Sequence, residues 1–163
     1  MASFQLVGLS PAAFTPLFDL SDTQLAERCA RRVEASEYPG YPCRVSLRDA
    51  EVGEELLLLP YDHQPAASAY RASGPIYVRR GAEQSILPPG VVPEQAGRCL
   101  LSIRAYDAEH LITVADVAEG PRIAETIEQF FADEHVDYIH LHYAKRGCFF
   151  SLVRRAQAPH GHP

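Results

Sequence analysis

The sequence lacks a paired-cysteine motif and a long apolar run. No two of the four cysteines (Cys29, Cys43, Cys99 and Cys148) form a Cys-x-x-Cys pair, which excludes a zinc-knuckle or thioredoxin signature. The longest uninterrupted apolar run, Leu56 to Leu59, falls far short of the ~20 residues that a membrane-spanning helix needs. We therefore expect no membrane partner.

A secretory signal is also missing from the pattern at the start of the chain. The residues from Met1 to Gln5 contain no basic region, and no apolar stretch follows them. Together with cysteines that show no paired spacing, this predicts a cytoplasmic protein whose thiols are reduced. Lysine occurs once, at Lys145, and asparagine not at all, which we attribute to codon bias.

Positive charge is in deficit. The chain has 15 Lys and Arg against 21 Asp and Glu, a formal net charge of −6. The densest basic groups, Arg28 with Arg31 and Arg32, and Arg79 with Arg80, are typical of solvated faces and form no stripe. A negative field repels phosphate backbones, so we expect no nucleic-acid partner.

The length and the order of the predicted elements indicate one domain. At 163 residues the chain is close to the commonest domain size, and we assign residues 1–155 to a single domain and 156–163, with His160 and His162, to a frayed tail. Strands recur in sequential hairpins and helices are few, which predicts an α+β fold: an antiparallel β-sheet built from sequential hairpins with two principal helices. No strand, Gly-rich turn and helix follow one another, so Rossmann and P-loop sites are excluded.

Two segments show helix signals. Ser21 and Gln24 have the spacing of a capping box and predict a helix over residues 22–32. Pro121 suits the first turn of a second helix, over residues 121–132. The apolar stripe expected to bury the first helix consists of Leu25, Cys29 and Val33.

The last predicted hairpin carries two histidines. Side chains alternate across a strand, so His140 and His142 share one face while Ile139 and Leu141 share the core face. A turn over residues 144–147 pairs Tyr143 with Cys148, Leu141 with Phe150 and Ile139 with Leu152, which places Cys148 in the core and leaves His142 opposite Phe149 and His140 opposite Ser151. A slip of one residue would instead bring Cys148 to the histidines.

A second hairpin adds polar groups to the same surface. Pairing Tyr106 with Leu111 puts Arg104 and Tyr106 on the face opposite Ile103. If the two hairpins belong to one sheet, Arg104, Tyr106, His140 and His142 line a common surface. Arginine and imidazolium groups donate to carboxylate or phosphate, so we expect a site for a small anionic ligand there, with His63 and Arg44 as further candidates.

Other interpretations of these residues remain open. Two histidines on one face of a strand can ligate a metal, with His63, Asp62 or Asp116 as a third ligand, although no spacing dictates one and we predict no metal. Cys148 with a histidine base would make a thiol enzyme. A non-catalytic protein that forms a homodimer through its histidine face is a further alternative. No pattern indicates a cofactor or a catalytic residue.

Four segments together carry a family resemblance: Tyr38 to Leu47, Leu56 to Tyr61, Gly74 to Arg79, and Tyr138 to His140 together with Arg146 to Phe149. In these segments the chain resembles an uncharacterised bacterial family, domain of unknown function 1203, and the resemblance covers nearly the whole chain, from about Phe4 to Arg154. It implies a bacterial protein of stand-alone domain size. It supplies no activity, cofactor or site residue.

Overall fold

The protein has a mixed α+β fold with two five-stranded sheets. The computed structural model describes residues 3–157, so most of the predicted tail, including His160 and His162, lies outside the described residues. The elements are β1 (Phe4–Val7), the 3₁₀ helices η1 (Pro11–Ala13) and η2 (Thr15–Asp19), α1 (Asp22–Glu27), β2 (Arg31–Glu34), β3 (Pro42–Cys43), β4 (Arg48–Asp49), β5 (Glu55–Gln64), β6 (Ala72–Arg79), α2 (Glu94–Gly97), β7 (Leu101–Tyr106), β8 (Ile112–Ala118), α3 (Arg122–Phe131), β9 (Tyr138–Tyr143) and β10 (Phe149–Arg155).

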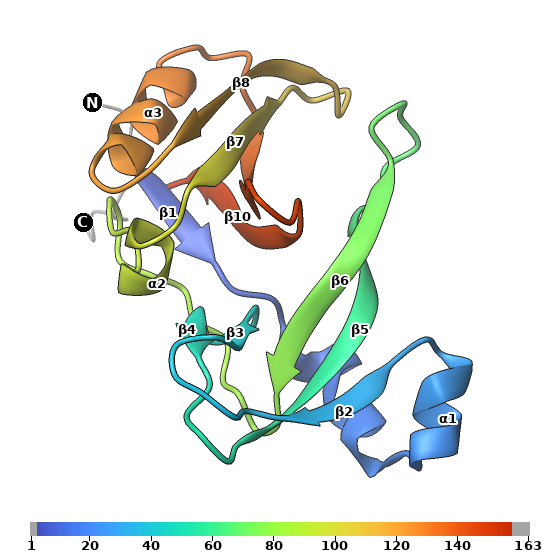
Figure 1. Cartoon of the computed structure of the whole chain (residues 1–163). Coiled ribbons are helices and arrows are strands. Elements are labelled where there is room, and N and C mark those ends of the chain that lie inside the picture. Colours follow the sequence, from blue (N-terminus) through green and yellow to red (C-terminus); the bar gives the residue numbers. More distant parts are fainter. Residues whose placement is uncertain (1–2, 158–163) are drawn as a thin grey trace, which may run out of the picture.

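The first sheet has the strand order β1-β10-β9-β7-β8 and is antiparallel throughout. Helix α3 packs on its outer face (Figure 1). The apolar stripe of α3 is buried through Ile123, Ile127 and Phe131. These side chains pack against the strand residues of the main core, among them Phe4, Leu101, Ile103, Ile139, Leu141, Phe150 and Val153.

The second sheet has the order β2-β5-β6-β3-β4 and is mixed, because β3 runs parallel to β6. The run of leucines in β5 makes both of its faces apolar. Leu57 and Leu59 join a core under η2 and α1, while Leu56 packs with Ala35 and Ala50 in a smaller cluster. A strand that is buried on both faces needs cover on both sides, which the single expected sheet would not provide.

The long β5–β6 hairpin stands opposite the inner face of the first sheet (Figure 1). The chain passes from one sheet to the other at Gly8, just after β1. The Gly8 N–H donates to the Ser85 carbonyl, and the Leu9 N–H donates to the Arg44 backbone carbonyl. A Cβ atom at Gly8 would overlap the Val45 carbonyl oxygen, so only glycine lets these backbones approach.

The first predicted helix is shorter than expected. The capping box is confirmed. The Ser21 hydroxyl accepts from the backbone N–H of Gln24, and the side-chain oxygen of Gln24 accepts from the backbone N–H of Ser21. The helix then ends at Glu27. Cys29 takes a positive φ of 56°, and the Ala30 N–H donates to the Leu25 carbonyl, which is a Schellman ending. The expected stripe is therefore wrong beyond Leu25: Cys29 is exposed and Val33 lies in β2.

Two bulges correct the predicted hairpin registers. In β10, Phe149 pairs with His142 as expected, but Ser151 pairs with Leu141, so Phe150 is the extra residue and Leu152 lies opposite His140. In the other hairpin, Tyr106 pairs with Ile112 rather than Leu111. Phe150 still enters the main core, whereas Cys148 lies outside it and is half-buried.

Two further segments also contain regular structure. β5 continues to Gln64 and β6 begins at Ala72, so His63 stands on a strand. The long proline-containing segment 81–96 includes the start of α2. Within residues 3–157, no helix has both the length and the apolarity to cross a membrane.

Candidate functional site

The first sheet brings the predicted polar residues of β7 and β9 together. The two strands pair so that Arg104 lies opposite His140 and Tyr106 opposite Tyr138. These side chains project from the inner face, opposite to the one that packs on α3. The Tyr106 and His140 rings lie 4.9 Å apart between centroids, and Tyr106 and Tyr138 are stacked at 5.0 Å. The expected common surface therefore exists.

Strand β5 covers this surface. His63 lies edge-on to His142, with 4.8 Å between ring centroids, and stacks on Phe149 at 5.7 Å with an angle of 9° between the planes. We call His63, His140 and His142 the histidine layer. Burial is nearly complete for His140, which is 5% exposed, and complete for His142. The two histidines do lie opposite the α3-side core, as their alternation predicted, but their face is closed by the second sheet.

Burial keeps the histidine layer uncharged near neutral pH. Desolvation, with smaller contributions from the neighbouring His142, His63 and Arg104, lowers the pKa of His140 to about 3. Desolvation also lowers the pKa of His142 to about 4, although the Gly147 carbonyl, which accepts from Nδ1 at 2.9 Å, acts in the opposite direction. The pKa of His63 is lowered mainly by burial. Neutral imidazoles do not supply the positive charge expected at this surface.

The same layer contains buried nitrogen atoms without partners. His63 Nδ1, His140 Nδ1 and His142 Nε2 make no hydrogen bond to the part of the chain that the structure describes. Across that part, no group of three or more His, Cys, Asp and Glu side chains is arranged to hold a metal ion. The Cys148 thiol is directed elsewhere, 4.0 Å from the Arg146 carbonyl oxygen and at a different cavity.

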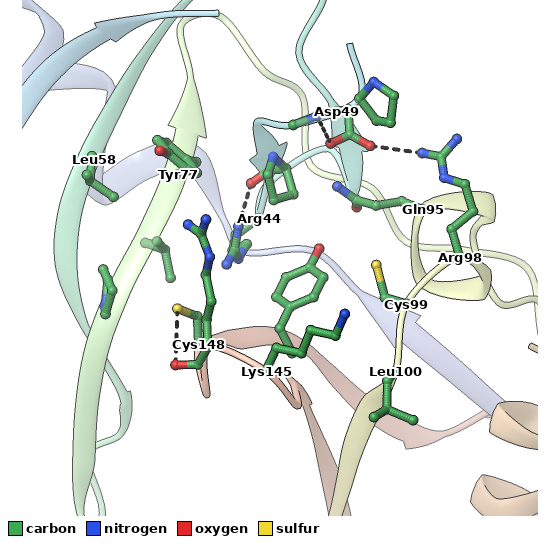
Figure 2. A pocket seen from close by; sticks show the side chains of 17 residues that line it. Arg44, Asp49, Leu58, Tyr77, Gln95, Arg98, Cys99, Leu100, Lys145 and Cys148 are labelled. Atoms are coloured by element: carbon green, nitrogen blue, oxygen red, sulfur yellow. Dashed lines mark hydrogen bonds and ion pairs between the residues drawn. The ribbon is translucent and has the colours of Figure 1, made fainter. Parts of the chain in front are cut away.

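That cavity, of about 760 Å³, lies between the β9–β10 turn, the β3–β4 turn, strand β6 and helix α2 (Figure 2). We call it the arginine cavity, after the three arginines that line it, Arg44, Arg98 and Arg146. Its size is within the range of small-molecule sites. Its wall includes apolar groups, and its polar lining consists of Arg44, Asp49, Gln95, Arg98, Tyr143, Lys145, Arg146 and the thiols of Cys99 and Cys148.

Arg44 is fixed at the first position of the turn after β3. Its N–H donates to the Tyr77 carbonyl, as the parallel pairing of β3 with β6 requires. The guanidinium Nε donates to the Phe149 carbonyl at 2.8 Å and Nη1 donates to the Pro42 carbonyl, while the group lies 5.1 Å from the centre of the Tyr143 ring. Arg44 is only 3% exposed, and burial lowers its pKa. It joins the two candidate regions, because Phe149 contacts the histidine layer through its ring.

Positively charged side chains outnumber carboxylates around the arginine cavity. Among residues 3–157, Asp49 is the only carboxylate that lines it, and this side chain already accepts from Arg98 Nη2 at 3.1 Å and from the Gly40 N–H. Lys145 and Arg146 belong to the β9–β10 turn, where Gly147 adopts a φ of 80°. Neither Lys145 nor Arg146 forms a salt bridge within residues 3–157.

The predicted site residues are thus divided between two places. Five of them (Arg104, Tyr106, His63, His140 and His142) gather between the sheets, and Arg44 lines the arginine cavity. Sequence reasoning missed Gln95, Arg98, Lys145, Arg146 and Tyr143 as cavity residues. Their positions carry no shared spacing, since two distant segments, 95–98 and 143–146, supply them, and only the isolated basic pair in the 144–147 turn was a usable signal.

Comparison with known proteins finds one family. A family model described as a protein of unknown function (DUF1203) matches residues 40–155. Neither the curated proteins nor the solved structures gave a match. The matched segment contains the histidine layer and every polar residue of the arginine cavity named above. Because the match covers well over half of the chain, the protein belongs to the DUF1203 family.

Proposed function

We propose that the protein binds a small organic anion in the arginine cavity. The observation that carries this proposal is a buried guanidinium, that of Arg44, without a carboxylate partner among residues 3–157. Arginine stays protonated in proteins even when its pKa is lowered. A buried charge is costly unless it is paired, and an anion in the cavity would pair this one.

Other arginines of the chain pair with carboxylates, whereas Arg44 does not. Arg32 and Arg80 both pair with Glu55, and Arg79 pairs with Glu54, although all three are more exposed than Arg44. The partners of Arg44 are neutral carbonyl oxygens and an aromatic ring. A side chain that water can reach needs a counter-ion less than a buried one does. Arg44 is therefore the position at which a negatively charged group of a ligand would be stabilised most.

The surroundings favour an anion of organic type. Lys145 and Arg146 add positive charge beside Arg44, in a chain whose formal net charge is −6. Such a local reversal of sign attracts anions. Leu58, Ile76 and Leu100 line the same cavity, and apolar walls with a few convergent polar groups are typical of small-molecule sites.

The histidine layer is less suited to the other proposals made from the sequence. Its rings are covered within one chain by β5 and Phe149, so a homodimer interface built on them would require the β5–β6 hairpin to move away. Its neutral imidazoles would have to bind protons before they could attract an anion. Binding of the anion at Arg104 and the histidines is therefore the weaker form of the proposal.

A thermal-shift screen of carboxylates and phosphate esters tests the proposal, with calorimetric titration of the hits. A ligand at 100 times its Kd stabilises the folded state by about 2.7 kcal/mol, which raises the melting temperature measurably. We expect Arg44→Met to weaken each hit by at least about tenfold, since charge-assisted hydrogen bonds contribute about 1.5–3 kcal/mol.

The matched control is Arg31→Met, the same exchange at an exposed position of β2 outside the cavity, which should leave every affinity unchanged. Arg44→Lys, which keeps the charge but not the fork of donors, should bind with intermediate affinity. A screen without hits, or hits that Arg44→Met binds as tightly as the wild type, would refute the proposal. Hits that weaken with Arg104→Met instead would place the site at the histidine layer.

A further inference from the structure

Gln95 is a second buried group of the arginine cavity whose hydrogen bonds are unfulfilled. It lies in α2, is 6% exposed, and lines the cavity (Figure 2). Both amide atoms, Nε2 and Oε1, are buried and have no partner among the described residues. A buried polar group without a hydrogen bond destabilises the folded state, so native proteins rarely retain one without a compensating contact.

The neighbours of Gln95 do not complete its hydrogen bonds. Asp49, the carboxylate beside it in Figure 2, accepts instead from Arg98 and Gly40. The hydroxyl of Tyr143, on the same cavity, is likewise buried without a partner. The cavity therefore presents a carboxamide that needs one donor and one acceptor together, with a hydroxyl that can supply either.

An amide fits this need, and a simple anion does not. A secondary amide offers an N–H to Oε1 and a C=O to Nε2, whereas a carboxylate or phosphate only accepts and would leave Oε1 unpaired. The cavity holds the Arg44 cation, the Gln95 amide and an apolar wall within about 760 Å³. An N-acylated amino acid carries the matching three groups: a carboxylate, an amide and an apolar substituent.

We propose that the anion of the arginine cavity is an amide-bearing carboxylate of the N-acyl amino acid class, and that Gln95 recognises its amide. This inference rests on the proposed function, because it presumes that Arg44 binds the carboxylate. Gln95 then determines which anions are accepted, while Arg44 supplies binding common to all of them.

Paired probes test the two roles separately. N-acetylglycine, N-benzoylglycine and N-acetyl-leucine are each titrated against the ester counterpart in which oxygen replaces the amide N–H. We expect the wild type to bind at least one amide about tenfold or more tightly than its ester, because the ester leaves Oε1 unpaired. In Gln95→Leu this preference should fall below about threefold, because neither probe then has a Gln95 amide to bind. Arg44→Met should weaken the amide and the ester in parallel.

Each result distinguishes the two proposals. Equal binding of amide and ester by the wild type, or an amide preference that survives in Gln95→Leu, overturns the role of Gln95 and would mean that the group only holds water. If no N-acyl probe binds while a phosphate ester or simple carboxylate does, the amide class is wrong and anion binding stands. If no anion binds at all, the proposed function itself fails. Where Gln95→Leu does not fold, the comparison of probes in the wild type still decides whether the amide N–H of the ligand contributes to binding.

Discussion

Mild acid should destabilise this protein because two buried histidines have to stay neutral in the folded state. An unfolded histidine begins to bind a proton near its ordinary pKa of 6.5, whereas His140 and His142 in the folded chain do so only near 3 and 4. Between these values the unfolded state binds more protons, so stability falls as pH falls. Above about pH 6.5 the two groups contribute no pH dependence.

The size of the effect follows from the differences in pKa. One pKa unit corresponds to ~1.4 kcal/mol, so complete titration of His140 opposes folding by about 5 kcal/mol and that of His142 by about 3 kcal/mol. At pH 5 neither ring is charged in the folded state, and each contributes a loss of about 2 kcal/mol, or about 4 kcal/mol together. This is a large share of the roughly 5–15 kcal/mol that stabilises a typical domain.

Urea denaturation at pH 7 and pH 5 measures this loss above the range in which most carboxylates titrate. The double variant His140→Gln, His142→Gln should lose much less stability over the same interval, with a remainder from His63, whose pKa is also lowered. A double variant that loses as much stability as the wild type would refute this account of the histidine layer.

Three further predictions concern the fold. Gly8→Ala should destabilise the protein by more than about 2 kcal/mol in urea denaturation, because its Cβ overlaps the Val45 carbonyl, and a wild-type unfolding curve would contradict this. Ser21→Ala should cost about 1 kcal/mol by removing the cap of α1, and a change below about 0.3 kcal/mol would mean that α1 contributes little to the fold. Thiol titration in denaturant without reductant should find four free cysteines per chain, and a count of two or none would show disulfides instead.

Local features of the structure were predictable because a few neighbouring residues encode them. The Ser21 and Gln24 spacing predicted the capping box, and Pro121 predicted the start of the helix that the structure has as α3. The alternation in β9 correctly separated His140 and His142 from the Ile139 face. In each case the sequence pattern is shorter than the element that it predicts, and the prediction needs no contact with residues far away in the chain.

Features that depend on one residue of backbone conformation were not predictable in this way. The first helix ends where Cys29 adopts a positive φ, although its side chain gives no sign of this and glycine is the usual residue there. The bulge at Phe150 moves the register of β10 by one residue after a correct start at Phe149. Both choices depend on how the segment packs against the rest of the chain.

The sequence by itself determined an α+β protein with strands, a capped first helix and a histidine-bearing strand. Tertiary structure alone decided that there are two sheets, that β5 closes the face on which His140 and His142 lie, and that Arg44 meets Lys145 and Gln95 at one cavity. The physical reason is the separation along the chain of the residues that interact. Periodicity and capping act over a few residues, whereas the cavity joins segments about 50 residues apart in the chain, and only the packing of the two sheets brings them together.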